Sequence, residues 1–310
     1  MKHLLLLLFV GFSLATARAD EPVVQKNIAY LGADRSAPKA DLYTPPGAHA
    51  APLPAVLLIH GGGWVSGDKA DARGVSVSTD LAGAGYVVFA INYHLGNANA
   101  KPAPILAWPQ DLYDCKSALR YMRKQAAQLG IDPTRIAVMG ESAGGHLSLL
   151  IGSTAHVDDL NKGGLYTDQS NEVSCIVDLY GVPDLAAFDQ KRIVPLFKGA
   201  TDAETAENIR RASPVTYIDA KTPPVLILHG TIDSLVPVAT SRQLADHLKQ
   251  LGVPCQYFEY PALNHGFSLQ PVVRDPTAAP GEHKTIKMDL RPPVLAFLAR
   301  YLGAPNAGPQ

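Results

Sequence analysis

Ser142 is the central residue of the pattern G-x-S-x-G, which spans Gly140 to Gly144. An apolar, strand-like run over 135–139 precedes the pattern, and an apolar helical stretch over 142–151 follows it. A sharp turn from strand to helix forces its central residue into strained backbone angles and holds the side-chain hydroxyl clear of the sheet. Small residues at 140 and 144 let the chain pass closely there. We therefore predict that Ser142 is a nucleophile rather than part of an ordinary glycine-rich turn.

A serine hydroxyl needs a base to activate it, and that base needs an acid to orient it. Asp233 follows the apolar run Val225–Leu228, and His265 follows the run Gln256–Tyr260. Capping of the next helix is the alternative role for Asp233, and a plain surface position is the alternative for His265. The chain order Ser, Asp, His favours a catalytic triad in which Asp233 is the acid and His265 the base.

A glycine-rich segment, His60-Gly61-Gly62-Gly63-Trp64, follows another apolar run, Ala55–Ile59. Acyl transfer builds negative charge on a carbonyl oxygen, and backbone N–H groups are suitable donors because their positions are fixed in advance. We assign this oxyanion hole to the amides of Gly61 or Gly62, or both, together with Ala143. A phosphate cradle is the competing use of such glycines, but no G-K-[ST] follows them.

Residues around this predicted site have supporting roles. Trp64 is expected to line the substrate pocket, although simple packing is an alternative, and Gly63 to support the turn. His60 is expected to pin the glycine loop by hydrogen bonds, and His146 to pack against the serine turn. No H-E-x-x-H pattern and no Cys or His pair at zinc-ligand spacing occurs, so neither a metal nor a cofactor is expected.

The elements that must position these residues alternate along the chain. Near-continuous apolar runs indicate strands buried on both faces, which is typical of a parallel sheet. Amphipathic stretches between them predict helices that cover both faces of the sheet. The fold class is therefore α/β, and its chemistry is expected at the carboxyl ends of the strands. The expected strands are 23–31, 40–43, 55–59, 86–92, 135–139, 175–179, 225–228 and 256–260, and the main expected helices are 75–84, 108–129, 142–151, 238–251 and 288–301.

Two stretches interrupt this alternation, 153–171 and 183–222. Long insertions in a compact domain are usually functional loops or lids, and a solvated surface excursion is the alternative. No repeat or linker divides the chain, so residues 20–310 are predicted to form a single domain with a small lid around 183–222.

The first residues have the features of a secretory signal peptide. A short basic start precedes the apolar run Leu4–Leu14, and Ala17-Arg18-Ala19 provides a small-x-small cleavage pattern. The apolar run is too short to span a bilayer. We predict cleavage after Ala19, so that 1–19 is removed and the mature protein is secreted or periplasmic.

Composition limits the partners. The chain has 27 Lys and Arg against 28 Asp and Glu, a formal net charge of −1, so neither nucleic acid nor an anionic membrane is indicated as a partner. Export permits disulfides, but three cysteines are odd in number and far apart, and the pairing stays open. Cys175 and Cys255 stand at the start of strand-like runs, where buried thiols are expected.

Four motifs in order, HGGGW, GESAGG, HGTIDSLVP and YPALNHGF, resemble those of α/β-hydrolases. The branch they resemble contains hormone-sensitive-lipase-like and bacterial feruloyl-esterase-like carboxylesterases, and the similarity runs from about Ala40 to the last helix. The resemblance implies an α/β-hydrolase fold with about eight mostly parallel strands. It also implies the same triad and oxyanion donors. The large amino-terminal cap of the lipase-like enzymes has little room before Ala55, so a smaller lid is expected.

These features predict a serine carboxylesterase that hydrolyses short-chain acyl esters through an acyl-enzyme. Candidate substrates are small or glycan-linked esters, including acetyl or feruloyl esters of plant polysaccharide. An amide hydrolase resembling formamidases could use the same triad, and a non-catalytic binding protein on the same scaffold is the third alternative.

Overall fold

A computed structural model describes residues 21–49, 51–275, 277–278 and 282–305. The predicted signal peptide, 1–19, lies outside the described residues. Within the described ranges, no helix is long and apolar enough to cross a membrane. Cys115, Cys175 and Cys255 are free thiols, the first two buried and the third half-buried.

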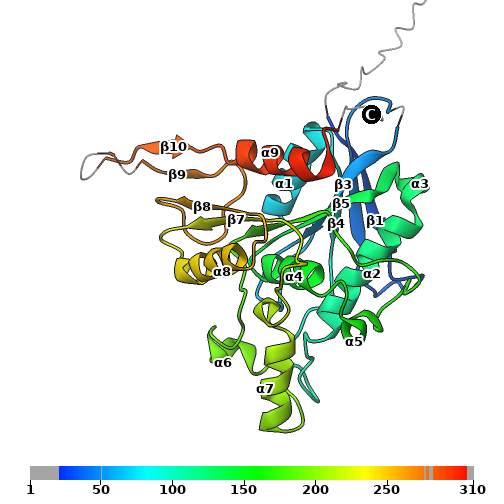
Figure 1. Cartoon of the computed structure of the whole chain (residues 1–310), viewed down its shortest axis with the longest axis vertical. Helices are drawn as coiled ribbons and strands as arrows, with labels where there is room; N and C mark the ends of the chain where they lie inside the picture. The colour runs from blue at the N-terminus through cyan, green and yellow to red at the C-terminus, as the bar shows by residue number, and fades with distance from the viewer. Residues whose placement is uncertain (1–20, 50, 276, 279–281, 306–310) are drawn as a thin grey trace, which may run out of the picture.

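A mostly parallel sheet of eight strands forms the centre of the structure (Figure 1). Its strand order is β1-β2-β4-β3-β5-β6-β7-β8, and only β2 runs against its neighbours. The expected α/β fold is confirmed. The strands are β1 Val23–Ile28, β2 Ala40–Thr44, β3 Leu53–Ile59, β4 Val87–Ile91, β5 Ile131–Glu141, β6 Cys175–Leu179, β7 Val225–Gly230 and β8 Cys255–Tyr260.

Two layers of helices cover the sheet, with α9 and α1 on one side and α8 and α4 on the other (Figure 1). Each of the eight expected strands is present, and each main expected helix is present within a few residues, although 108–129 divides into α2 and α3. The helices are α1 Ala72–Gly83, α2 Gln110–Lys124, α3 Ala126–Leu129, α4 Ala143–Ser153, α5 Asp158–Asn161, α6 Gln190–Ile193, α7 Asp202–Arg211, α8 Val238–Gln250 and α9 Arg291–Leu302, with a short 3₁₀ helix at Pro214–Thr216.

Strand β3 shows why the apolar runs are continuous. Its successive side chains point to opposite faces of the sheet. Leu57 and Ile59 join the core under α2, α4 and α8, whereas Val56 and Leu58 join the core under α1 and α9. Because both faces are buried, every position of the strand has to be apolar.

The insertion over 183–222 packs apolar side chains into the core, although many of its polar residues are exposed. It contains α6 and α7, at the lower end of Figure 1, and the 3₁₀ helix. Leu185, Phe197 and Ala212 are fully buried in the same core as α4. The Ala107 N–H also donates to Leu196 O at 3.0 Å.

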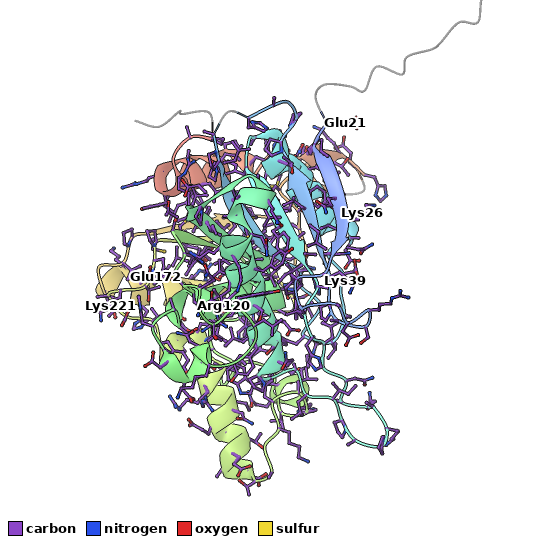
Figure 2. The ribbon with its side chains drawn as sticks, turned by 90° about the vertical axis from the view of Figure 1, so that its right-hand side faces the viewer. Glu21, Lys26, Lys39, Arg120, Glu172 and Lys221 are labelled. Carbon is purple, nitrogen blue, oxygen red and sulfur yellow. The ribbon has the colours of Figure 1, made fainter. Side chains whose placement is uncertain are left out.

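Two buried cations of α2 hold the other insertion, over 153–171. The Lys116 ammonium donates to Leu160 O and Asn161 Oδ1 at 3.2 and 2.6 Å. The guanidinium of Arg120, labelled in Figure 2, donates to carbonyls that include Gly163 O at 2.9 Å. These carbonyls replace the water that burial removes from the two charges.

A short antiparallel hairpin, β9 Val272–Arg274 with β10 Thr285–Lys287, was not expected from the sequence. It extends away from the sheet beside α9 (Figure 1). Its strands have three residues each, too short for a hydrophobic period to show.

Gly144 provides a test of the close packing at the serine turn. A Cβ at this position would come within 2.1 Å of Ile59 O and 2.7 Å of His60 O. We expect the clash in Gly144→Ala to lower the free energy of unfolding by about 1–3 kcal/mol. The higher helix propensity of alanine should offset up to about 1 kcal/mol of this loss. Denaturant unfolding monitored by circular dichroism measures the change.

The matched control is Gly83→Ala at the end of α1, where a Cβ would meet nothing within 4 Å. This variant should be as stable as the original chain or slightly more stable. Equal stability of the two variants would contradict the close approach of α4 and β3.

Candidate active site

The structure brings the three predicted triad residues together. Ser142 lies between β5 and α4, Asp233 follows β7, and His265 follows β8. The distance from His265 Nε2 to Ser142 Oγ is 2.8 Å, and the distance from His265 Nδ1 to Asp233 Oδ2 is 2.7 Å. Both are hydrogen-bond distances, so His265 bridges the hydroxyl and the carboxylate.

The backbone at Ser142 is strained as predicted, with φ 54° and ψ −117°. A non-glycine residue adopts a positive φ only where its surroundings enforce it. Here the Ser142 N–H donates to Leu179 O of β6 at 2.9 Å, and the His146 N–H donates to Ser142 O at 2.9 Å. The residue is therefore held between the sheet and the first turn of α4.

Asp233 is a fully enclosed carboxylate with several donors. Its Oδ1 accepts the backbone N–H groups of Leu235 and Val236, both at 2.8 Å. Burial raises the pKa of Asp233, but hydrogen bonds from His229, His265 and these amides outweigh burial and hold the pKa below its usual range. Because the carboxylate can only accept, His265 carries its proton on Nδ1, which leaves Nε2 free to accept the Ser142 hydroxyl proton.

His229 is a contact of Asp233 that sequence reasoning missed. It lies in β7, which continues two residues beyond the expected end, and its side chain is 0% exposed. Nε2 is 3.2 Å from Asp233 Oδ2 and 3.0 Å from Val236 O, and Nδ1 is 2.7 Å from Ser241 Oγ. Two acceptors at Nε2 place the ring proton there. A polar residue in an otherwise apolar run was the available signal.

A second set of contacts that the sequence did not reveal supports His265 from the other side. The Tyr180 ring packs edge-on against the His265 ring, with centroids 4.8 Å apart. The Tyr180 hydroxyl donates to Glu141 Oε2 at 2.6 Å, and that oxygen also accepts Arg73 Nε at 2.8 Å. Arg73 Nη1 in turn donates to Gly266 O at 3.2 Å. The loop that carries His265 is thereby tied to the end of β5.

Ser142 and His265 open into a cavity of about 650 Å³, within the size range of small-molecule sites. Its wall combines apolar and basic side chains from the glycine loop, the insertion over 183–222 and the loop after Asp233. The lining residues are Gly62, Gly63, Trp64, Val65, Arg73, Ala98, Ser142, Tyr180, Val182, Phe188, Lys191, Arg192, Pro195, Leu196, Leu235, Val236, His265 and Gly266.

Trp64 both lines this cavity and packs beneath it. It is 2% exposed, and its indole N–H donates to His146 Nδ1 at 3.1 Å. His146 Nε2 donates to Ala212 O at 2.7 Å. Burial lowers the pKa of His146 to about 4, so the ring stays neutral and Nδ1 remains an acceptor. His146 packs at the serine turn, as predicted, and also joins the glycine loop to the insertion over 183–222.

The predicted oxyanion donors lie close to Ser142. Gly62 is on the cavity wall, as is Gly63. Gly61 does not line the cavity, and a Cβ added there would be 3.2 Å from Ser142 Cβ. The Gly61 carbonyl accepts a hydrogen bond from His60 Nδ1 at 2.6 Å. His60 pins this loop as expected. Ala143 begins α4, where backbone N–H groups lack an acceptor within the helix.

No group of three or more His, Cys, Asp or Glu side chains that could hold a metal ion occurs among the residues that the structure describes.

The chain is similar to a known protein family and to proteins named as esterases. The family model BD-FAE matches residues 40–248. Esterase LipC of Mycobacterium tuberculosis is 32% identical over 226 residues, which cover 70% of this chain and 54% of LipC. The chain spans about half the length of the curated relatives it matches first.

Solved structures are similar over more of their length. A truncated carbohydrate esterase from gut microbiota has a TM-score of 0.70 at 25% identity, covering 80% of this chain and 91% of that one. An acetyl ester-xyloside bifunctional hydrolase from Caldicellulosiruptor lactoaceticus has a TM-score of 0.61 at 30% identity, covering 74% and 80%. From the family match, the sheet topology and these neighbours, the chain belongs to the BD-FAE family and has the α/β-hydrolase fold.

Proposed function

We propose that this chain is a serine carboxylesterase that hydrolyses short-chain acyl esters through a covalent acyl-enzyme. The observation that carries the proposal is the position of His265, 2.8 Å from Ser142 Oγ and 2.7 Å from Asp233 Oδ2, at the edge of a cavity. The similarity to proteins named as esterases supports it.

In the proposed reaction, His265 Nε2 takes the hydroxyl proton as Ser142 Oγ attacks the ester carbonyl. Asp233 stabilises the imidazolium that forms. The tetrahedral intermediate collapses, the bond to the alcohol oxygen breaks, and His265 gives its proton to that oxygen. Water then attacks the acyl-enzyme by the same route, releasing the acid and restoring Ser142.

The negative charge of each tetrahedral intermediate needs N–H donors at the cavity wall. We propose the amides of Gly62 and Ala143, because Gly62 lines the cavity and Ala143 begins α4. Gly61, predicted with them, does not line the cavity. Gly63, assigned to the turn, also lines the cavity and is a further donor in this proposal.

The proposed substrates are acetyl esters of a carbohydrate. Two solved structures named as a carbohydrate esterase and an acetyl ester-xyloside hydrolase support this class. A cavity of about 650 Å³ is much larger than an acetyl group, so most of it is available to the alcohol part of the ester. Feruloyl esters are the second substrate class that this volume allows.

The first test compares aryl esters from acetate to decanoate, with the original chain beside Ser142→Ala. We expect kcat/KM to fall with acyl length, and the variant to lose at least about 10⁴-fold in kcat because the nucleophile is gone. An organophosphate should also attach once, at Ser142, as located by mass spectrometry.

Ser148→Ala is a matched control, because Ser148 is a serine in α4, close to Ser142 in the chain, but it is buried and does not line the cavity. It should retain ester hydrolysis. If the folded original chain turned over no ester, the esterase proposal would be overturned, in favour of amide substrates or a binding role.

A second test concerns His229, which donates to the triad carboxylate. His229→Phe removes this donor, so the Asp233 carboxylate should hold the protonated form of His265 more strongly. We expect kcat/KM to fall about 10-fold, as for one hydrogen bond to a charged group, and the acid limb of the pH profile to move to higher pH. His229→Gln keeps an N–H donor, so it should restore both kcat/KM and the position of the acid limb. An unchanged acid limb in His229→Phe would show that His229 acts only through packing.

We also propose that the protein is exported, on the basis of the predicted signal peptide. Amino-terminal sequencing of the protein recovered outside the cytoplasm should begin at Asp20. Ala17→Leu combined with Ala19→Leu should block processing because signal peptidase needs small residues there. Recovery of Met1 at the terminus of the mature protein would refute cleavage.

A further inference from the structure

The cavity beside Ser142 is lined by basic side chains and by no acidic ones. Arg73, Lys191 and Arg192 stand on its wall, whereas none of the described residues that line it is Asp or Glu. The cavity wall therefore differs in charge from the whole chain, in which 27 Lys and Arg nearly equal 28 Asp and Glu. The triad carboxylate, Asp233, is 0% exposed and lies behind His265.

In the insertion over 183–222, basic residues line the cavity and acidic residues do not. The insertion contains six Lys or Arg and six Asp or Glu, yet the two of these that line the cavity are Lys191 and Arg192. Both belong to α6, whose N-cap Asp189 accepts the Lys191 backbone N–H at 3.1 Å. The cap fixes the start of the short helix that brings the two cations to the wall.

Part of this positive charge is not neutralised by protein carboxylates. Arg192 Nε is 3.5 Å from Asp189 Oδ2, with both side chains largely exposed. Lys191 makes no ion pair within the described ranges. Arg73 pairs with Glu141 through Nε and with Gly266 O through Nη1, which leaves N–H groups of its guanidinium unused.

The setting strengthens the attraction that these cations exert. Charges of one sign in a cleft with apolar walls focus the field and raise the local concentration of oppositely charged ligands. Trp64, Phe188 and Leu196 supply the apolar wall here. When a neutral ester is bound, water alone solvates the cations. An ester with a carboxylate forms ion pairs with them.

We propose that the substrate of this site is an ester whose alcohol part carries a carboxylate, bound by Lys191 and Arg192 with Arg73 near the serine. The carboxylate belongs to the alcohol because a short acyl group fills little of the cavity. The inference rests on the proposed esterase function and narrows it. A uronic acid within an acetylated glycan and a small hydroxy acid are the two sources of this chemistry.

The experiment uses two pairs of acetyl esters, and in each pair one member carries a carboxylate that the other lacks. One pair is 3-acetoxybenzoate and its methyl ester, and the other is an acetylated xylo-oligosaccharide with and without a uronic acid branch. We expect kcat/KM to favour the anionic member of at least one pair by about 5- to 10-fold, the effect of two partly exposed ion pairs. The preference should shrink as salt is raised.

Charge-reversal variants identify the groups responsible. Lys191→Glu combined with Arg192→Glu should abolish or invert the preference. The control, Lys198→Glu combined with Lys221→Glu, makes the same charge change in the same insertion at residues that do not line the cavity, and it should keep both the preference and the activity.

Each outcome separates this inference from the function on which it rests. A preference in the glycan pair alone identifies a uronic acid, and a preference in the aryl pair alone identifies a small hydroxy acid; either upholds the inference. Equal rates within both pairs would overturn it and leave the esterase proposal standing. A preference that survives Lys191→Glu with Arg192→Glu would also overturn it. No hydrolysis of any ester would overturn both proposals.

Discussion

The positive φ of Ser142 is the constraint on which the rest of the site depends, because it decides where the hydroxyl points. Such a backbone costs about 1–3 kcal/mol for a residue with a side chain. The sheet and α4 hold it, since Ser142 donates its N–H to Leu179 O while α4 packs against the end of β3 at Gly144. The glycine is required because any Cβ would overlap the carbonyls of Ile59 and His60.

A second requirement follows from the first. A hydroxyl held in place needs an aligned base, and a base on a loop has to be fixed by its neighbours. His265 is fixed on one side by Asp233 and on the other by the Tyr180 ring. The buried carboxylate of Asp233 is tolerated because N–H donors surround it. The same donors keep its pKa low, so that it is charged when His265 takes a proton in the proposed reaction.

The insertion over 183–222 contacts the glycine loop beside Ser142 through His146. Its Ala212 carbonyl accepts His146 Nε2, and His146 in turn accepts the Trp64 indole N–H. The segment that carries Lys191 and Arg192 is thus joined to the glycine loop through one neutral imidazole. The serine turn and the segment that carries the basic cavity residues therefore pack against the same core.

The sequence by itself determined the order of the strands along the chain, the main helices, the serine turn and the three residues predicted as a triad, because each is encoded by a local pattern. Apolar runs reveal strands buried on both faces, and G-x-S-x-G reveals a turn that few other residues permit. The tertiary structure alone decided the contacts of His229, Tyr180 and Arg73, and the positive cavity wall. Arg73 and Gly266 are 193 residues apart, and no local period links such positions. Their meeting depends on the order of strands across the sheet and on the paths of loops, which only the folded chain specifies.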